Sequence, residues 1–267
     1  MPPRITPLIL TADEEPNLAR VLARLEWAER IVVVDSFSTD ATPAIARADR
    51  RVTFLQRTFD GHEHQWNYGI DQCPTDWVLA LDADYVLSEE LVRELTSVPL
   101  GSGPVAYYAR FRYCIHGRPL RRTLYPPRAV LFDRRECRYR QEGHTQILTI
   151  PGPSAFLEGT IAHDDRKPLG RWLRAQERYT ELTVRDLLAR TGGPMKREDR
   201  LRLKIWPVPP LVLAFCLFRQ GLIWEGWPGW YLAFQRTLTE TMVALRLMDH
   251  RLAAQPKAAE HPGERPR

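Results

Sequence analysis

Two aspartates separated by a single residue, Asp82 and Asp84, close the apolar run at positions 77–81. In an extended chain, side chains two residues apart point to the same side, so the two carboxylates are expected to lie together. Their like charges repel unless a cation or several donors lie between them. Carboxylate oxygens are ligands that Mg²⁺ and Mn²⁺ prefer, commonly alongside substrate phosphates. The pair therefore suggests a metal and diphosphate site.

A purely structural interpretation of the pair remains open, because aspartates that follow a strand often cap the next helix. Two features favour a convergent acidic site. A helix start is expected at Ser88, and a third carboxylate, Asp35, ends an earlier apolar run. Asp35 could accept hydrogen bonds from a base or ribose. The sequence contains neither GxxxxGKS nor GxGxxG, so a nucleotide would be held by metal and side chains.

The N-terminal third of the chain alternates short apolar runs with amphipathic stretches. The runs are rich in β-branched residues, which predicts buried strands separated by helices, and hence a mostly parallel α/β sheet. Ligands of such sheets bind beyond the carboxyl ends of the strands, where Asp35 and the Asp82/Asp84 pair fall. The runs are ITPLIL, RIVVVD, VTFLQR and WVLALD.

Three regions are predicted along the chain. Residues 1–165 form an α/β domain whose second part, 101–165, is rich in turns and arginines and reads as a mixed sheet. Residues 166–252 show helical periodicity and end in an aromatic-rich segment. Residues 253–267 lack any apolar period and are expected to be disordered.

Charge is unevenly distributed although the net charge is only +5. Ten arginines lie between Ala109 and Arg140 and could face phosphate or another anionic partner; the alternative is a solvated arginine-rich surface. The four cysteines have no zinc-binding spacing and suit a reducing compartment. They are Cys73, Cys114, Cys137 and Cys216.

Two apolar stretches bear on location. The first, at residues 5–10, is too short for a signal peptide and is followed by acidic residues. The second, at residues 205–218, is shorter than the roughly 20 residues that a spanning helix needs. Three prolines in its first half shorten any helix further, so the segment is expected to lie on a membrane rather than cross it. The tryptophans around it suit such a monotopic contact, and packing over the α/β domain is the alternative. We therefore expect a cytoplasmic protein peripheral to the inner face of the plasma membrane, with a C-terminal helical, membrane-associating appendage.

The combined motifs resemble the family 2 glycosyltransferases of the GT-A fold. The likeness rests on LILTADEEPNLARVLARLEWAERIVVVDSFSTDAT and FDGHEHQWNYGIDQCPTDWVLALDAD. It continues through LYPPRAVLFDRR, EGHTQI, AHDDRKPLGRWLRAQERYT and FRQGLIWEGWPGWYLAF. The branch most similar is the one that includes bacterial lipopolysaccharide core glucosyltransferases. The resemblance implies that residues 1–100 form the nucleotide-binding part of a GT-A domain and that residues 101–165 form its acceptor part.

The resemblance also implies roles for single residues. Thr11, Glu14 and Asp35 would line the nucleotide pocket. Asp82 would contact the ribose or pyrimidine, and Asp84 would bind Mg²⁺ or Mn²⁺.

Further matches lie outside the strand ends. Gln65 and Asn67 correspond to a Gln-(Lys/Arg)-Asn element at the start of a helix that flanks the donor. His163 corresponds to a late histidine that could approach the metal or the acceptor; a structural histidine is the alternative.

Three positions depart from the family pattern. Tyr85 follows the aspartate pair where relatives usually have Glu, and Trp66 stands where a basic residue is common. The usual Val-His-Glu appears as Gly143-His144-Thr145, so the glutamate that could act as base is absent.

Two residues near this last departure are candidate bases. Glu142 lies just before the motif, and His144 lies within it. Each could instead be structural.

The resemblance implies an inverting, metal-dependent transfer of a hexose from a nucleotide diphosphate sugar, chiefly a UDP-sugar, to a lipid-linked or lipopolysaccharide-type glycan. One alternative is a protein of the same fold that has lost catalysis and binds nucleotide sugar or glycan as a partner or regulator. A nucleotidyltransferase is disfavoured, because LILTADEEPN lacks a glycine-rich basic loop. No nucleic-acid partner is expected, and the oligomeric state is left open.

Overall fold

The computed structural model describes residues 5–121, 125–142, 145–191, 193 and 195–254. It divides the chain into two compact units, Met1–Lys167 and Pro168–Arg267. We call the first the α/β unit and the second the helical unit, and describe each by itself.

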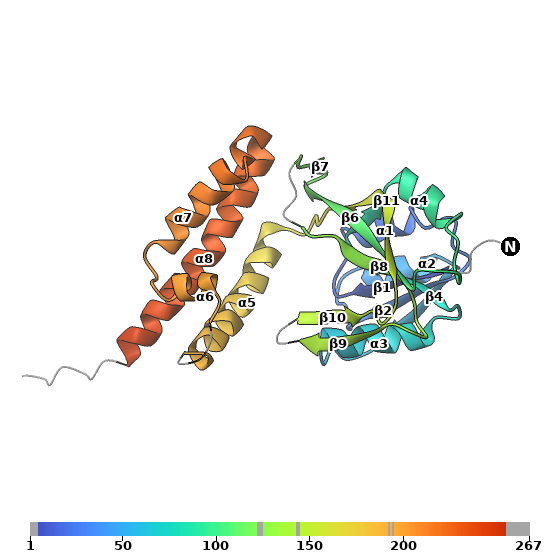
Figure 1. Ribbon diagram of the computed structural model, residues 1–267, viewed down its shortest axis with the longest axis horizontal. Helices are drawn as coiled ribbons and strands as arrows, with labels where there is room; N and C mark the ends of the chain where they lie inside the picture. The colour runs from blue at the N-terminus through green and yellow to red at the C-terminus, as the bar shows by residue number, and fades with distance from the viewer. Residues whose placement is uncertain (1–4, 122–124, 143–144, 192, 194, 255–267) are drawn as a thin grey trace, which may run out of the picture. The chain divides into compact units, whose positions relative to one another are not determined.

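The α/β unit is built on a nine-stranded mixed sheet with the order β3-β2-β1-β4-β8-β6-β11-β5, and β7 pairs with β6 (Figure 1). The four strands predicted from apolar runs are confirmed as β1 to β4, and they pair in parallel. A separate hairpin is formed by β9 and β10. The strands are β1 (Ile5–Thr11), β2 (Ile31–Asp35), β3 (Val52–Gln56), β4 (Trp77–Asp82), β5 (Tyr85–Leu87), β6 (Ala106–Ile115), β7 (Arg118–Pro119), β8 (Arg128–Asp133), β9 (Arg138–Glu142), β10 (Thr145–Thr149) and β11 (Ser154–His163).

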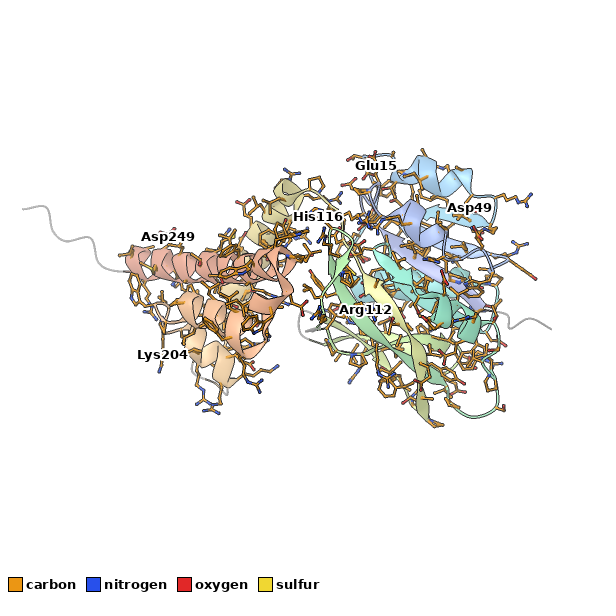
Figure 2. The ribbon with its side chains drawn as sticks, turned by 90° about the horizontal axis from the view of Figure 1, so that it is seen from above. Glu15, Asp49, Arg112, His116, Lys204 and Asp249 are labelled. Atoms are coloured by element: carbon orange, nitrogen blue, oxygen red, sulfur yellow. The ribbon has the colours of Figure 1, made fainter. Side chains whose placement is uncertain are left out.

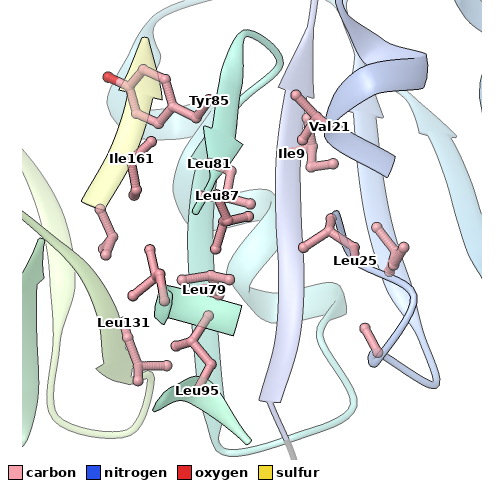
Figure 3. Close-up of a cluster of buried hydrophobic side chains, with 14 of the residues drawn as sticks. Ile9, Val21, Leu25, Leu79, Leu81, Tyr85, Leu87, Leu95, Leu131 and Ile161 are labelled. Carbon is pink, nitrogen blue, oxygen red and sulfur yellow. The ribbon is translucent and has the colours of Figure 1, made fainter. Parts of the chain in front are cut away.

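Alternation along the central strands divides the core into two layers. Ile9 and Leu81 pack with the helices α1 and α4 on one face, as Figure 3 shows. Leu8 and Val78 point to the other face and pack with α3. Both faces of the parallel strands are thus buried, which explains their continuous apolar sequence. The helices of this unit are α1 (Leu18–Leu22), α2 (Thr42–Ala48), α3 (His62–Gln72) and α4 (Glu89–Leu95).

The strand β11 carries an irregularity that is held by α4. Its register against β6 shifts between Phe156 and Thr160. The Glu94 carboxylate accepts hydrogen bonds from the amides of Glu158 at 3.0 Å and Gly159 at 3.1 Å. These bonds satisfy amides that the irregular pairing releases. A Cβ on Gly159 would lie 2.4 Å from the backbone of Leu91, so the close approach of the two elements requires glycine.

The Asp82–Asp84 segment is not extended, contrary to the sequence-based expectation. The strand β4 ends at Asp82, and Ala83 and Asp84 form a turn before β5 begins at Tyr85. The chain must leave β4 here because β5 pairs with β11 at the far edge of the sheet. The two carboxylates are therefore brought together by a turn rather than by strand alternation. The predicted helix start is confirmed, since the Ser88 hydroxyl accepts a hydrogen bond from the Leu91 amide at 3.2 Å.

The helical unit contains two long helices and several short ones. A buried cluster that includes Val184 and Leu187 on α5 and Val243 and Leu247 on α8 joins the long helices. No helix within the described part of the chain is both long and apolar enough to cross a membrane. The predicted disorder at 253–267 falls mainly outside the described residues. The elements are α5 (Leu169–Ala189), α6 (Arg197–Arg202), α7 (Val208–Ala214), a π-helical turn η1 (Phe215–Arg219), a 3₁₀ turn η2 (Leu222–Glu225) and α8 (Trp227–Ala253).

We expect Gly159→Ala to lower the free energy of unfolding by about 1–3 kcal/mol, because the added methyl overlaps the Leu91 backbone, which cannot rotate away. Chemical denaturation measures the effect. Gly170→Ala is the control, since its Cβ would meet only the end of Arg174 at 3.9 Å. Equal stability of the two variants would contradict the packing described for β11.

Candidate functional site

The carboxyl ends of the parallel strands bring the predicted nucleotide-pocket residues to one edge of the sheet. Thr11 is paired with Asp35 across β1 and β2, and Leu10 is paired with Asp82 across β1 and β4. Thr11, Asp35 and Asp82 therefore end three adjacent strands. This is the location where open α/β sheets bind ligands.

The Asp35 carboxylate is fully buried and surrounded by donors. It accepts hydrogen bonds from the Thr11 hydroxyl at 2.8 Å and from the Gln56 amide at 3.1 Å. The backbone amide of Ser38 donates at 2.8 Å, and the Ser38 hydroxyl also contacts the carboxylate. These donors compensate for the cost of burying the charge and fix its orientation.

The two predicted residues on α3 occupy different environments. Gln65 is buried and donates to the Ser36 hydroxyl at 3.1 Å, so it lies beside the Asp35 turn. Asn67 makes two hydrogen bonds with the backbone of Tyr139, at 2.9 and 3.1 Å, and thereby ties β9 to α3. Trp66 is buried and stacks on the Tyr139 ring, with 5.4 Å between centroids. The tryptophan is therefore part of the hydrophobic core of the α/β unit.

Glu14 is held in a buried ion pair. Its carboxylate lies 2.7 Å from the Lys167 ammonium and accepts a hydrogen bond from Asn17 at 2.9 Å. The pKa of Glu14 is raised to about 7, chiefly by burial and in smaller part by the nearby charge of Asp84, while Lys167 and Asn17 oppose the shift. Glu14 is therefore close to the protonation midpoint at neutral pH.

The chain after β11 is anchored so that Lys167 reaches Glu14. Buried Asp164 accepts hydrogen bonds from Arg20 at 2.7 Å and from the Gly117 amide at 2.8 Å. Sequence analysis assigned no role to Lys167 or Asp164, although both lie in the matched stretch AHDDRKPLGRW. Only the fold shows that this stretch closes on the end of β1.

Asp84 and His163 form the central contact of the site. Asp84 Oδ2 lies 3.1 Å from His163 Nε2, and both side chains are largely buried. Burial disfavours the charged form of both side chains, but the hydrogen bond and the opposite charge of the partner favour it more strongly. The pKa of Asp84 is therefore lowered, and the pKa of His163 is raised. Burial and the charge of Asp84 raise the pKa of Asp82. The site thus pairs one firmly ionised carboxylate with a second one that takes up a proton more readily.

A group of tyrosines that sequence analysis did not assign encloses His163. The rings of Tyr85, Tyr113 and Tyr125 pack edge-on against the imidazole, with centroid distances of 5.3, 5.0 and 4.9 Å. The hydroxyls of Tyr85 and Tyr125 lie 2.8 Å apart. Tyr85, which departs from the family pattern, therefore supports the wall of the site.

Three arginines of the arginine-rich stretch have different environments. Arg135 pairs with Asp133 at 2.6 Å, and Arg138 pairs with Asp71 at 2.9 Å. Arg128 differs, because its guanidinium lies 4.5 Å from the centre of the Tyr125 ring, and Asp82 is among the charges that raise its pKa. Among the described arginines of the stretch, Arg128 is the one that these contacts place at the acidic site.

The predicted metal site can be tested against these contacts. No group of three or more His, Cys, Asp or Glu side chains converges on one point in the described residues. Asp84 Oδ1, however, is buried and makes no hydrogen bond within that part of the chain. Mg²⁺ commonly takes only one or two protein carboxylates together with substrate phosphates. The residues therefore fit an ion that arrives with a diphosphate.

The two candidate bases are only partly visible. Glu142 ends β9 and pairs with Thr145 across the β9–β10 hairpin. His144 lies outside the described residues. The assignment of either as base stays a prediction.

With this geometry established, comparison with known proteins identifies the family. The sequence matches the family described as "Glycosyl transferase family 2" over residues 8–162, more than half of the chain. The chain belongs to the family 2 glycosyltransferases. It is 25% identical over 262 residues to the lipopolysaccharide core biosynthesis glycosyltransferase LpsC of Rhizobium meliloti, covering 94% of this chain and 95% of that protein. An uncharacterized glycosyltransferase of Rickettsia conorii is 35% identical over 93 residues, covering 34% of this chain and 33% of its own length.

The fold also matches that of a solved structure. The crystal structure of S. aureus TarS 1-349 in complex with UDP-GlcNAc aligns with a TM-score of 0.51 at 12% identity, over 94% of this chain and 92% of that one. The predicted fold class is confirmed at the level of a mixed α/β, GT-A-like architecture.

We expect His163→Gln to lower the thermal midpoint more at about pH 6 than at about pH 9, measured in chelating buffer. The pKa of His163 is raised in the folded state, so its contribution to stability is complete below the unfolded value. It is lost as the pH rises through the folded value. His64→Gln, on an exposed histidine of α3, is the control. A pH-independent difference would contradict the charged pair.

Proposed function

We propose that this glycosyltransferase moves a hexose from a nucleotide diphosphate sugar, most simply a UDP-sugar, to a lipid-linked or lipopolysaccharide-type glycan, with inversion and with Mg²⁺ or Mn²⁺. The observation that carries the proposal is the convergence of Asp82, Asp84 and His163 beside Asp35 at the carboxyl edge of a family 2 fold. The likeness to LpsC supports the acceptor class, and the TarS complex supports a UDP-sugar donor.

In the proposed site each residue has a defined task. Asp35, whose buried carboxylate is oriented by Thr11 and Ser38, lines the end of the pocket that takes the nucleoside. Glu14 and Gln65 line the same pocket, and Asn67 holds its wall through β9. Asp82 faces the ribose or pyrimidine, and Asp84 contributes Oδ1, which makes no hydrogen bond to the residues that the structure describes.

Inversion requires a single displacement at the anomeric carbon. A base, for which Glu142 is the candidate, removes the proton of the acceptor hydroxyl. The acceptor oxygen bonds to the anomeric carbon while the bond from that carbon to the diphosphate oxygen breaks, and the nucleoside diphosphate leaves. A divalent ion held by Asp84 would supply positive charge for the departing diphosphate.

The site would be completed at the cytoplasmic face of the plasma membrane, where a lipid-linked acceptor is available. His163 keeps Asp84 ionised through the contact at 3.1 Å, and the surrounding tyrosines limit the access of water. Arg128, beside Asp82, offers a further positive charge at this point.

A catalytically inactive nucleotide-sugar binder is the second candidate. Tyr85 favours this candidate, because it stands where relatives usually have a glutamate. Its hydroxyl contacts that of Tyr125, so an aromatic wall takes the place of a carboxylate. The burial of Trp66 weighs against it, because that departure is explained by core packing. Turnover separates the two candidates.

Saturation-transfer NMR with UDP-, GDP- and dTDP-sugars, with and without Mn²⁺, tests the proposal directly. We expect Mn²⁺-dependent binding of a UDP-sugar, followed over hours by slow release of free sugar. Binding without hydrolysis, and without transfer to lipopolysaccharide-type acceptors, would support the inactive binder. An absence of binding to every donor would overturn both candidates.

We expect Asp84→Asn to abolish transfer while leaving the fold intact. The substitution removes the negative charge that pairs with His163 and that would hold the metal. Transfer rate and circular dichroism measure the two effects. Asp71→Asn, an exposed aspartate on α3, is the matched control. Full activity of Asp84→Asn would remove Asp84 from the metal site.

We expect Glu142→Gln to slow transfer by about 10²–10⁴-fold, the usual contribution of a general base, while donor binding changes little. Glu136→Gln, in the turn before β9, is the control. An unchanged rate would place the base elsewhere.

A further inference from the structure

The helical unit exposes large apolar side chains, most of them aromatic, around one helical hairpin. The hairpin runs from Trp206 through α7, η1 and η2 into the first turns of α8. The most exposed members are Trp224 at 85%, Trp206 at 74% and Phe218 at 70%. In the α/β unit, by contrast, Trp66 and Trp77 are buried. The remaining exposed members are Leu211, Phe215, Trp227, Trp230 and Phe234.

The exposed side chains of the first arm form one stripe. On the first arm, Leu211, Phe215 and Phe218 have the i, i+4, i+7 spacing of one helix face. The opposite face is buried, with Cys216 and Leu217 turned inward.

The turn that joins the two arms is packed closely against the second arm. A Cβ on Gly229, in the first turn of α8, would lie 2.0 Å from the carbonyl oxygen of Leu222 in η2, so no further side chain fits there. Closer packing of this turn cannot bury the exposed aromatics, and the surface that they form is suited to an outside partner.

The distribution of charge indicates what that partner is. Between positions 206 and 238 the charged residues are Arg219, Glu225 and Arg236. The preceding segment is basic, with two acidic residues against five cations, of which Arg202 pairs with Glu240 of α8 at 2.6 Å. The other four cations are Lys196, Arg197, Arg200 and Lys204. Lys204, labelled in Figure 2, is exposed in the turn that follows α6. An apolar stretch rich in tryptophan and preceded by basic residues matches an anionic membrane interface.

The length of the hairpin limits how far it can enter a bilayer. The first arm, residues 208–219, is about 18 Å long at 1.5 Å per residue. The hydrocarbon core is about 30 Å thick, so this arm cannot cross it. Helices of this kind lie in the interface with their apolar face about 5–10 Å deep.

We infer that the hairpin 206–234 enters one leaflet of a bilayer that contains anionic lipid, with the basic segment 196–204 at the headgroups. This inference deepens the proposed function by naming the surface that brings the site to an amphiphilic acceptor. It does not depend on turnover, because it is tested without donor or acceptor. Vesicle binding without transfer would leave it intact while the proposed function failed.

Co-sedimentation of the full chain with vesicles tests the inference. One set contains phosphatidylcholine alone, and the other contains phosphatidylcholine with phosphatidylglycerol. We expect tighter binding to the second set, with tryptophan fluorescence quenched by lipids brominated in the upper acyl chain. Phe218→Ser and Trp224→Ser should each weaken binding about tenfold, because each removes a large apolar side chain from the leaflet.

Matched controls separate insertion from altered folding. Leu252→Ser, an equally apolar change at a side chain that is 61% exposed near the end of α8, should leave vesicle binding unchanged. Lys204→Gln should reduce the preference for phosphatidylglycerol, while circular dichroism remains that of the unaltered protein.

Three results would overturn the inference. The unaltered protein could fail to bind either set of vesicles. The hairpin variants could bind as tightly as the Leu252→Ser control. Sedimentation velocity could show a self-associated protein that the hairpin variants convert to monomer without any vesicle binding, which would assign the surface to a second copy of the chain.

Discussion

The buried contact between Asp84 and His163 joins the parts of the site that come from distant segments. Asp84 lies in the turn after β4, and His163 ends β11. Two carboxylates held close together in a low-dielectric environment destabilise each other unless a positive charge is near. The imidazolium supplies that charge, and its position depends on everything that places the end of β11.

The position of His163 in this contact depends on the packing of β11 on α4. Gly159 permits the close approach to Leu91, and Glu94 satisfies the amides at the irregularity of the strand. Beyond His163, the bonds of Asp164 to Arg20 and Gly117 direct the chain back toward β1. Structural residues that touch no ligand thus determine the geometry of the acidic site.

The helical unit has a different physical organisation. Its long helices pack through a small apolar cluster that includes Val184 and Leu247. Its hairpin, in contrast, exposes its largest side chains. A hairpin with exposed apolar side chains is suited to a partner that offers an apolar medium. The α/β unit, in contrast, buries Trp66 and Trp77 within its own core.

The local sequence pattern determined the parallel strands and the place of two carboxylates at their ends. Apolar runs placed β1 to β4, and the position of Asp35 and Asp82 at strand ends placed them at one edge, because parallel strands share a direction. What only the tertiary structure decided depends on contacts distant in sequence. The turn at Ala83, the bond of Asn67 to Tyr139 and the tyrosines around His163 have no local signature. The different partners of Arg128, Arg135 and Arg138 follow for the same reason, because they depend on contacts between segments distant in sequence.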